Sequence, residues 1–213
     1  MKKIFQLIIL SSALLITSCD LIEEAITGSK LGGEQSAIGQ VGVTVTSSSA
    51  QINGVSNFQA SVTSLSGGVS TYTGSATIAN TSIINTLTNL PGVTVSGNTV
   101  TVTGVKFKST TEGVESIYGF DPGILIKYSS SVGDEYEVLG SSTKRVVTAK
   151  SISDDFNWGG MMIKVIKVEE NINRGGIRKI TYFGNHKWGM VAVRFDFDDG
   201  SYSQFPIYNS ANN

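Results

Sequence analysis

The 213-residue sequence is poor in the residues that build disulfides and metal centres. It contains one cysteine and one histidine, which exclude an internal disulfide, a cysteine-based zinc cluster and a multi-histidine metal site. Its formal net charge of −1 lacks the basic surplus that nucleic-acid binding needs. We therefore predict no metal, no cofactor and no nucleic-acid partner.

Charged residues make up only 15% of the chain, and this scarcity is confined to one segment. Residues 35–105 are 71 consecutive positions without Asp, Glu, Lys or Arg, whereas residues 106–213 carry 26 charges in 108 positions. The aromatic residues divide at the same point, since only three of the 18 precede residue 106. We therefore consider 41–105 and 106–213 separately, and we expect them to share one fold.

The sequence holds one long apolar run, which is shorter than a transmembrane helix. It covers residues 4–16 and follows the two positive residues Lys2 and Lys3. Its 13 residues fall short of the ~20 that a spanning helix needs. A positive start and an apolar run of this length are typical of a secretory signal peptide.

The apolar run ends in Ile16-Thr17-Ser18-Cys19. This motif resembles the lipobox of bacterial lipoproteins. The resemblance implies that the signal peptidase recognises Ile16, Thr17 and Ser18 and removes residues 1–18. It also implies that Cys19 carries acyl chains such as palmitate, and two or more such chains anchor a protein stably to a membrane. An ordinary signal peptide followed by a chance cysteine is the alternative.

The same resemblance places the mature protein in the bacterial cell envelope, and we expect the outer membrane. Residues 19–40 would form the lipidated cysteine and a tether. The acidic residues Asp20, Glu23 and Glu24 follow the cysteine and leave open whether the protein faces the periplasm or the cell surface. The membrane, reached through the lipid anchor, is therefore a predicted partner.

Residues 41–105 show the alternation of β-strands. Apolar and small polar residues alternate over 41–46, and again over 93–102 on both sides of Ser96-Gly97-Asn98. Gly and Asn tolerate the positive φ of a short turn, so we predict a hairpin there. A low-complexity, glycosylated stalk is the alternative, but a stalk would be rich in proline. We favour a folded layer of strands.

One short helix is predicted near residues 82–90. Its four large apolar residues recur with helical spacing. Asn80 or Thr81 can cap its first turn, and Pro91 cannot continue it.

Residues 106–213 contain several short strand candidates separated by loops rich in Gly, Asn and Asp. We expect a two-residue turn at Asp199-Gly200, which would place Phe197 opposite Tyr202. The predicted fold class is mainly β, with an antiparallel sheet that forms a curved sheet, a sandwich or a half-barrel. The strand candidates are 123–129, 136–139, 145–149, 161–168, 177–183, 188–197 and 202–208.

Short motifs in residues 123–208 also resemble a group of uncharacterised bacterial envelope lipoproteins. They are Val132-Gly133-Asp134-Glu135-Tyr136, similar to a VGDxW/Y opening, and Trp188-Gly189-Met190-Val191, similar to part of a closing strand. The resemblance implies a curved antiparallel sheet of the lipoprotein-carrier type, and it implies no activity.

The sequence offers little for catalysis. The lipid would occupy Cys19, His186 lies in a turn-like segment, and no Gly-x-Ser-x-Gly motif is present. No two acidic residues stand out as the pair that glycoside hydrolysis needs. We therefore predict no catalytic residues and no enzyme, and a lipid-anchored hydrolase is the least favoured reading.

Trp158 and Trp188 are the candidate ligand-binding residues, since indole rings stack on sugars and pack against apolar ligands. Burial in the core is the alternative role for both. We expect a non-catalytic binding or accessory lipoprotein with an apolar or carbohydrate ligand. A structural or adhesive surface lipoprotein without a small-molecule ligand is the alternative function.

Overall fold

The computed structural model describes residues 30–47 and 54–212. Leu31–Asn213 form one compact unit, which contains both main sheets described below. Cys19 and the motif around it lie outside the described residues, so the lipid anchor stays a prediction. Within the described part of the chain, no helix combines the length and the apolar character needed to cross a membrane.

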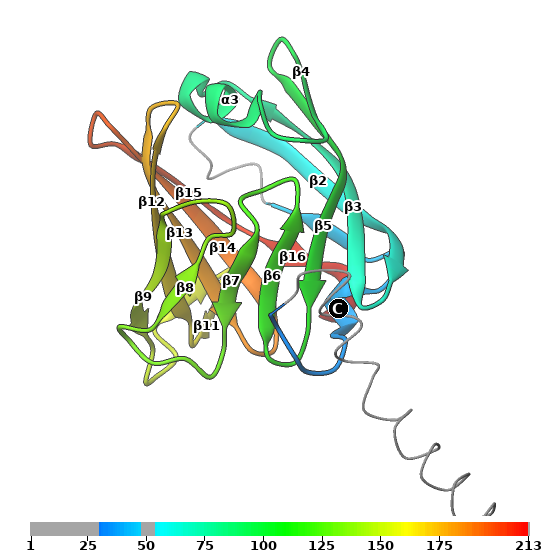
Figure 1. The fold of residues 1–213 in the computed structure, drawn as a ribbon, viewed down its shortest axis with the longest axis vertical. Helices are drawn as coiled ribbons and strands as arrows, with labels where there is room; N and C mark the ends of the chain where they lie inside the picture. The colour runs from blue at the N-terminus through cyan, green and yellow to red at the C-terminus, as the bar shows by residue number, and fades with distance from the viewer. Residues whose placement is uncertain (1–29, 48–53, 213) are drawn as a thin grey trace, which may run out of the picture. The chain divides into compact units, whose positions relative to one another are not determined.

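The fold is mainly β and antiparallel, as the sequence predicts. The larger sheet has eight strands in the order β16-β1-β2-β3-β5-β6-β7, with β4 paired to β5, and it curls into a half-barrel (Figure 1). The strand β5 crosses residue 105, so this sheet joins the uncharged segment to the charged one. Its strands are β1 (Thr44–Thr46), β2 (Val55–Ser66), β3 (Val69–Ile78), β4 (Val93–Ser96), β5 (Thr99–Ser109), β6 (Gly113–Tyr118), β7 (Gly123–Lys127) and β16 (Tyr208–Asn209).

A second sheet has six strands in the order β15-β14-β13-β12-β9-β8. The hairpin of β10 and β11 is separate from both larger sheets, and two 3₁₀ turns, η1 (Ala37–Gly39) and η2 (Ser210–Asn212), lie near the ends of the described chain. The remaining strands are β8 (Glu135–Glu137), β9 (Lys144–Lys150), β10 (Phe156–Trp158), β11 (Met161–Ile163), β12 (Ile166–Arg174), β13 (Ile177–Asn185), β14 (Gly189–Phe197) and β15 (Tyr202–Pro206).

A bulge in β5 keeps its apolar residues on one face. Tyr72 of β3 pairs with Val105, but the next residue, Thr73, pairs with Thr103, so Gly104 is an extra residue in the ladder. Its φ of +75° is readily adopted only by glycine. The extra residue shifts the alternation by one position, so that even-numbered residues before it and odd-numbered residues after it point inward. Such a bulge also increases the local bend of the strand.

The predicted hairpin and helix are both present. Ser96 pairs with Thr99, so Gly97 and Asn98 form a two-residue turn between β4 and β5. The helix α3 (Thr81–Leu87) starts at Asn80, whose side chain accepts a hydrogen bond from the backbone N–H of Ile83 at 3.2 Å. This N-cap satisfies one of the unpaired amides of the first turn.

The turn at Asp199-Gly200 differs from the prediction. Tyr202 pairs with Asp196 rather than with Phe197, whose N–H donates to the carbonyl of Ser201 at 2.9 Å. The loop therefore holds three residues, and the Asp199 carboxylate stabilises it by accepting from the Ser201 N–H at 2.9 Å. A three-residue loop shifts the register by one position relative to a two-residue turn.

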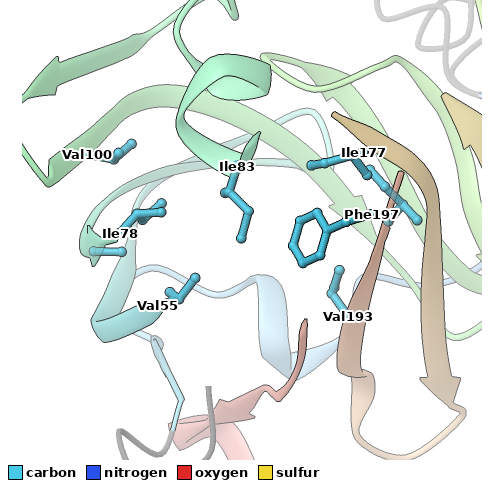
Figure 2. Close-up of a cluster of buried hydrophobic side chains, with 9 residues drawn as sticks. Val55, Ile78, Ile83, Val100, Ile177, Val193 and Phe197 are labelled. Atoms are coloured by element: carbon cyan, nitrogen blue, oxygen red, sulfur yellow. The ribbon is translucent and has the colours of Figure 1, made fainter. Parts of the chain in front are cut away.

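The two sheets and α3 meet in a shared hydrophobic cluster. Ile83 of α3 points into the space between the sheets, towards Val55 and Ile78 on one side and Val193 and Phe197 on the other (Figure 2). A helix this short is marginal alone, so its stability derives from this packing. The helix thus covers one end of the interior between the sheets (Figure 1).

Candidate functional site: an apolar cavity between the sheets

The interior between the two sheets is incompletely filled. It holds a cavity of about 310 Å³, which lies at the low end of the ~300–1,000 Å³ range of ligand pockets. The walls come from both main sheets and from α3. Most of the surface is hydrocarbon, contributed in part by Val55, Ile83, Val100, Val102, Val105, Ile180, Met190 and Val193.

Small residues on two neighbouring strands leave this space open. Ala60 of β2 pairs with Gly74 of β3, Ala76 lies two positions further along β3, and all three line the cavity. A Cβ at Gly74 would come within 2.6 Å of the Gln59 carbonyl oxygen, so the close approach of the strands requires glycine there. Large side chains at these inward positions would fill the core, as they do in most interiors.

Aromatic rings form another part of the wall. Phe205 of β15 lies 6.4 Å from Phe58 and 5.8 Å from Phe195, measured between ring centroids. Phe107 lies 5.9 Å from Phe120 in a stacked arrangement. These rings are only half-buried although they line the interior. Their uncovered carbon surface is therefore available to an apolar ligand.

Two charged side chains, Asp121 and Arg174, occur among the described residues that line the cavity. Asp121 lies in the loop between β6 and β7, and Arg174 ends β12. The Arg174 guanidinium donates from Nη2 to Asp121 Oδ2 at 2.9 Å and from Nη1 to Asp121 Oδ1 at 3.3 Å. The Arg174 side chain is 44% exposed and that of Asp121 is 27% exposed, so this pair is a charged part of the lining that reaches solvent.

The pair is held by contacts to its backbone. The Thr86 hydroxyl of α3 donates to the carbonyl of Arg174 at 3.0 Å. The carbonyl of Asp121 accepts from Arg145 Nη2 at 2.7 Å. The short helix and the smaller sheet therefore fix both ends of the ion pair.

Behind the pair lies a buried polar group that joins the two sheets. Arg145 of β9 is fully buried, and its Nε donates to Glu170 Oε2 at 2.7 Å while its Nη1 donates to the carbonyl of Ile124 at 3.2 Å. Tyr182, which lines the cavity, donates its hydroxyl to the same Glu170 oxygen at 3.3 Å. Burial raises the pKa of the Tyr182 hydroxyl, so it stays protonated as a donor.

The structure places Trp158 and Trp188 beside each other but outside the cavity wall. Their ring centroids are 5.2 Å apart, and Trp158 lies 5.3 Å from Tyr208. Trp158 is buried, and its indole N–H donates to the carbonyl of Ile207 at 3.0 Å. Trp188 is half-buried in the same cluster. Trp158 therefore already has a hydrogen-bond partner and a packed environment without a ligand.

Three acidic residues of the second sheet are held in separate ion pairs. Glu170 is paired with Arg145, Asp196 with Arg194 at 2.6 Å, and Glu169 with Lys179 at 3.0 Å. His186 is exposed in the turn between β13 and β14. Over residues 30–47 and 54–212, no group of three or more His, Cys, Asp or Glu side chains could hold a metal ion.

Sequence reasoning missed the cavity residues and the Asp121–Arg174 pair. A signal for the cavity was available, because Ala60, Gly74 and Ala76 are small residues at inward positions of alternating strands. No local signal indicates the ion pair, since its partners are 53 residues apart in the chain. Comparisons with protein-family models, curated proteins and solved structures found no match for this chain.

Proposed function

We propose that this chain is a non-catalytic, lipid-anchored protein of the bacterial cell envelope that binds an apolar ligand in the cavity between its sheets. The cavity of about 310 Å³ carries the proposal, because its wall is mostly hydrocarbon. Folded proteins pack their interiors densely, so an apolar space of this size is an exception that a ligand would explain. The Ile16–Cys19 motif supports the lipid anchor.

The chemistry of the wall favours an apolar ligand over a carbohydrate. Sugars need several hydrogen-bonding groups, and burying them without partners is costly. An alkyl chain needs none. A methylene group takes about the volume of a water molecule, ~30 Å³, so the cavity accommodates at least about ten. Ten buried methylenes contribute ~8 kcal/mol at ~0.8 kcal/mol each, and the cost of association offsets part of this, so we expect an affinity weaker than micromolar.

The test is a fluorescence titration with N-phenyl-1-naphthylamine, a neutral dye that emits strongly in apolar surroundings. It uses the chain starting at Asp20, because both sheets lie within the compact unit Leu31–Asn213. We expect saturable enhancement that dodecan-1-ol reverses and that glucose or N-acetylglucosamine leaves unchanged. No enhancement, or enhancement that the alcohol does not reverse, would contradict ligand binding and favour a structural or adhesive lipoprotein.

A further inference from the structure

We infer that the ligand is a single-chain amphiphile with an anionic headgroup, and that Arg174 binds this headgroup at the mouth of the cavity. The inference rests on the proposed function and specifies its ligand class. The wall of the cavity is mostly hydrocarbon, and its lining contains one ion pair that reaches solvent. A pocket with this division suits a molecule that has an apolar chain and one charged end.

The hydrogen bonds and the exposure of the pair favour an anionic headgroup. Asp121 uses both carboxylate oxygens to accept from Arg174. A guanidinium carries five N–H donors, and these two bonds occupy one donor on Nη1 and one on Nη2. Arg174 therefore has donors left to bind a second anion while it keeps Asp121, and it is the more exposed member of the pair, whereas a cation would have to reach the less exposed Asp121 beside the Arg174 guanidinium.

The surroundings of Arg174 also suit a headgroup site. Its side chain is 44% exposed, so it can reorient without breaking core packing. Its backbone is held by Thr86, and its partner Asp121 is held by Arg145. Arg145 itself is fully buried and already neutralised by Glu170, which makes Arg174 the accessible guanidinium at this end of the cavity.

The planar guanidinium matches two headgroup chemistries, carboxylate and phosphate, because both accept paired hydrogen bonds from it. A free fatty acid would supply the first, and a phosphorylated lipid the second. The experiment therefore compares dodecanoate and dodecyl phosphate with dodecan-1-ol and dodecylamine, each displacing N-phenyl-1-naphthylamine from the chain starting at Asp20. The four competitors share their chain length and differ in the headgroup.

We expect dodecanoate, dodecyl phosphate or both to displace the dye at a concentration about tenfold lower than dodecan-1-ol requires. A hydrogen bond to a charged group contributes a free energy that corresponds to about this difference. The anion that binds more tightly shows whether the headgroup is that of a fatty acid or of a phosphorylated lipid. Arg174→Gln should bring the anions to within about twofold of the alcohol when all of them displace the dye from the same variant. Arg178→Gln, which removes an exposed charge four positions away on β13 and outside the cavity wall, is the matched control and should keep the preference.

Asp121→Asn provides a second test, since it leaves Arg174 without its internal carboxylate. We expect it to strengthen dodecanoate binding about threefold and to leave dodecan-1-ol unchanged. Equal binding of anions and alcohol, tighter binding of dodecylamine, or an anion preference that survives Arg174→Gln would each overturn the headgroup inference while the proposed function stands. Failure of the dye and of all four competitors to bind would instead overturn the proposed function.

Discussion

Filling the cavity from its small-residue side should abolish ligand binding without unfolding the protein. Ala60→Phe adds a phenyl ring at a position that lines the cavity. The ring takes at most about six methylene volumes, which is up to roughly 180 Å³ at ~30 Å³ each, of the 310 Å³ available. A dodecyl chain would then lose burial of about three to six methylenes, or ~2.4–5 kcal/mol, so its affinity should fall about 100-fold or more.

The same substitution should not lower the free energy of unfolding. The ring enters existing space, and a buried Phe contributes ~1.5–3 kcal/mol relative to an exposed one, so the free energy of unfolding should stay constant or rise by ~1–2 kcal/mol. In a fully packed core the same change would cost ~1–3 kcal/mol through strain. Urea unfolding and dye binding are measured on the same sample, with the surface variant Ala37→Phe as control. Loss of stability in Ala60→Phe, or undiminished dye binding, would refute this reasoning.

Four further predictions concern other parts of the chain. Glu170→Ala leaves the buried Arg145 guanidinium without its carboxylate partner and should lower the free energy of unfolding by ~3–5 kcal/mol in a urea titration. A loss below ~1 kcal/mol would show that the Arg145–Glu170 pair does not stabilise the fold. Burial raises the pKa of Tyr72 to about 12; because the unfolded tyrosine ionises near pH 10, the stability that this residue contributes below pH 10 should fall by ~2–3 kcal/mol by pH 12. Tyr72→Phe should lose correspondingly less than wild type when urea unfolding is compared at these two pH values. Trp158→Phe should lower stability but leave dodecanoate affinity within about twofold, whereas a large loss of affinity would show that this ring contacts the ligand. Cys19→Ala should abolish incorporation of radiolabelled palmitate, and persistent label would show that the lipobox interpretation is wrong.

Local features of the fold could be predicted from the sequence because their causes are local. The Ser96-Gly97-Asn98 turn follows from residues that tolerate positive φ, and α3 from the capping side chain of Asn80. Alternation of apolar and hydroxyl residues similarly marks the strands of the uncharged segment. In each case the residues that determine the structure lie within a few positions of one another.

The features that could not be predicted depend on contacts that form only in the folded chain. The Gly104 bulge becomes visible only when β3 and β5 are paired, and without it Val105 would face outward. The three-residue loop at Asp199 depends on a side-chain hydrogen bond that competes with a tighter turn. The cavity is less predictable still, since its wall combines small residues of one sheet with side chains of the other sheet and of α3.

The most direct test of a ligand site between the two sheets is a set of isotope-edited NMR contacts between bound dodecanoate and the methyl groups of the chain starting at Asp20. We expect contacts from the alkyl chain to Ile83, Val102 and Val193, which line the cavity. Contacts confined to the exposed Ile152 and Met162, or no contacts at saturating dodecanoate, would contradict a ligand site between the two sheets.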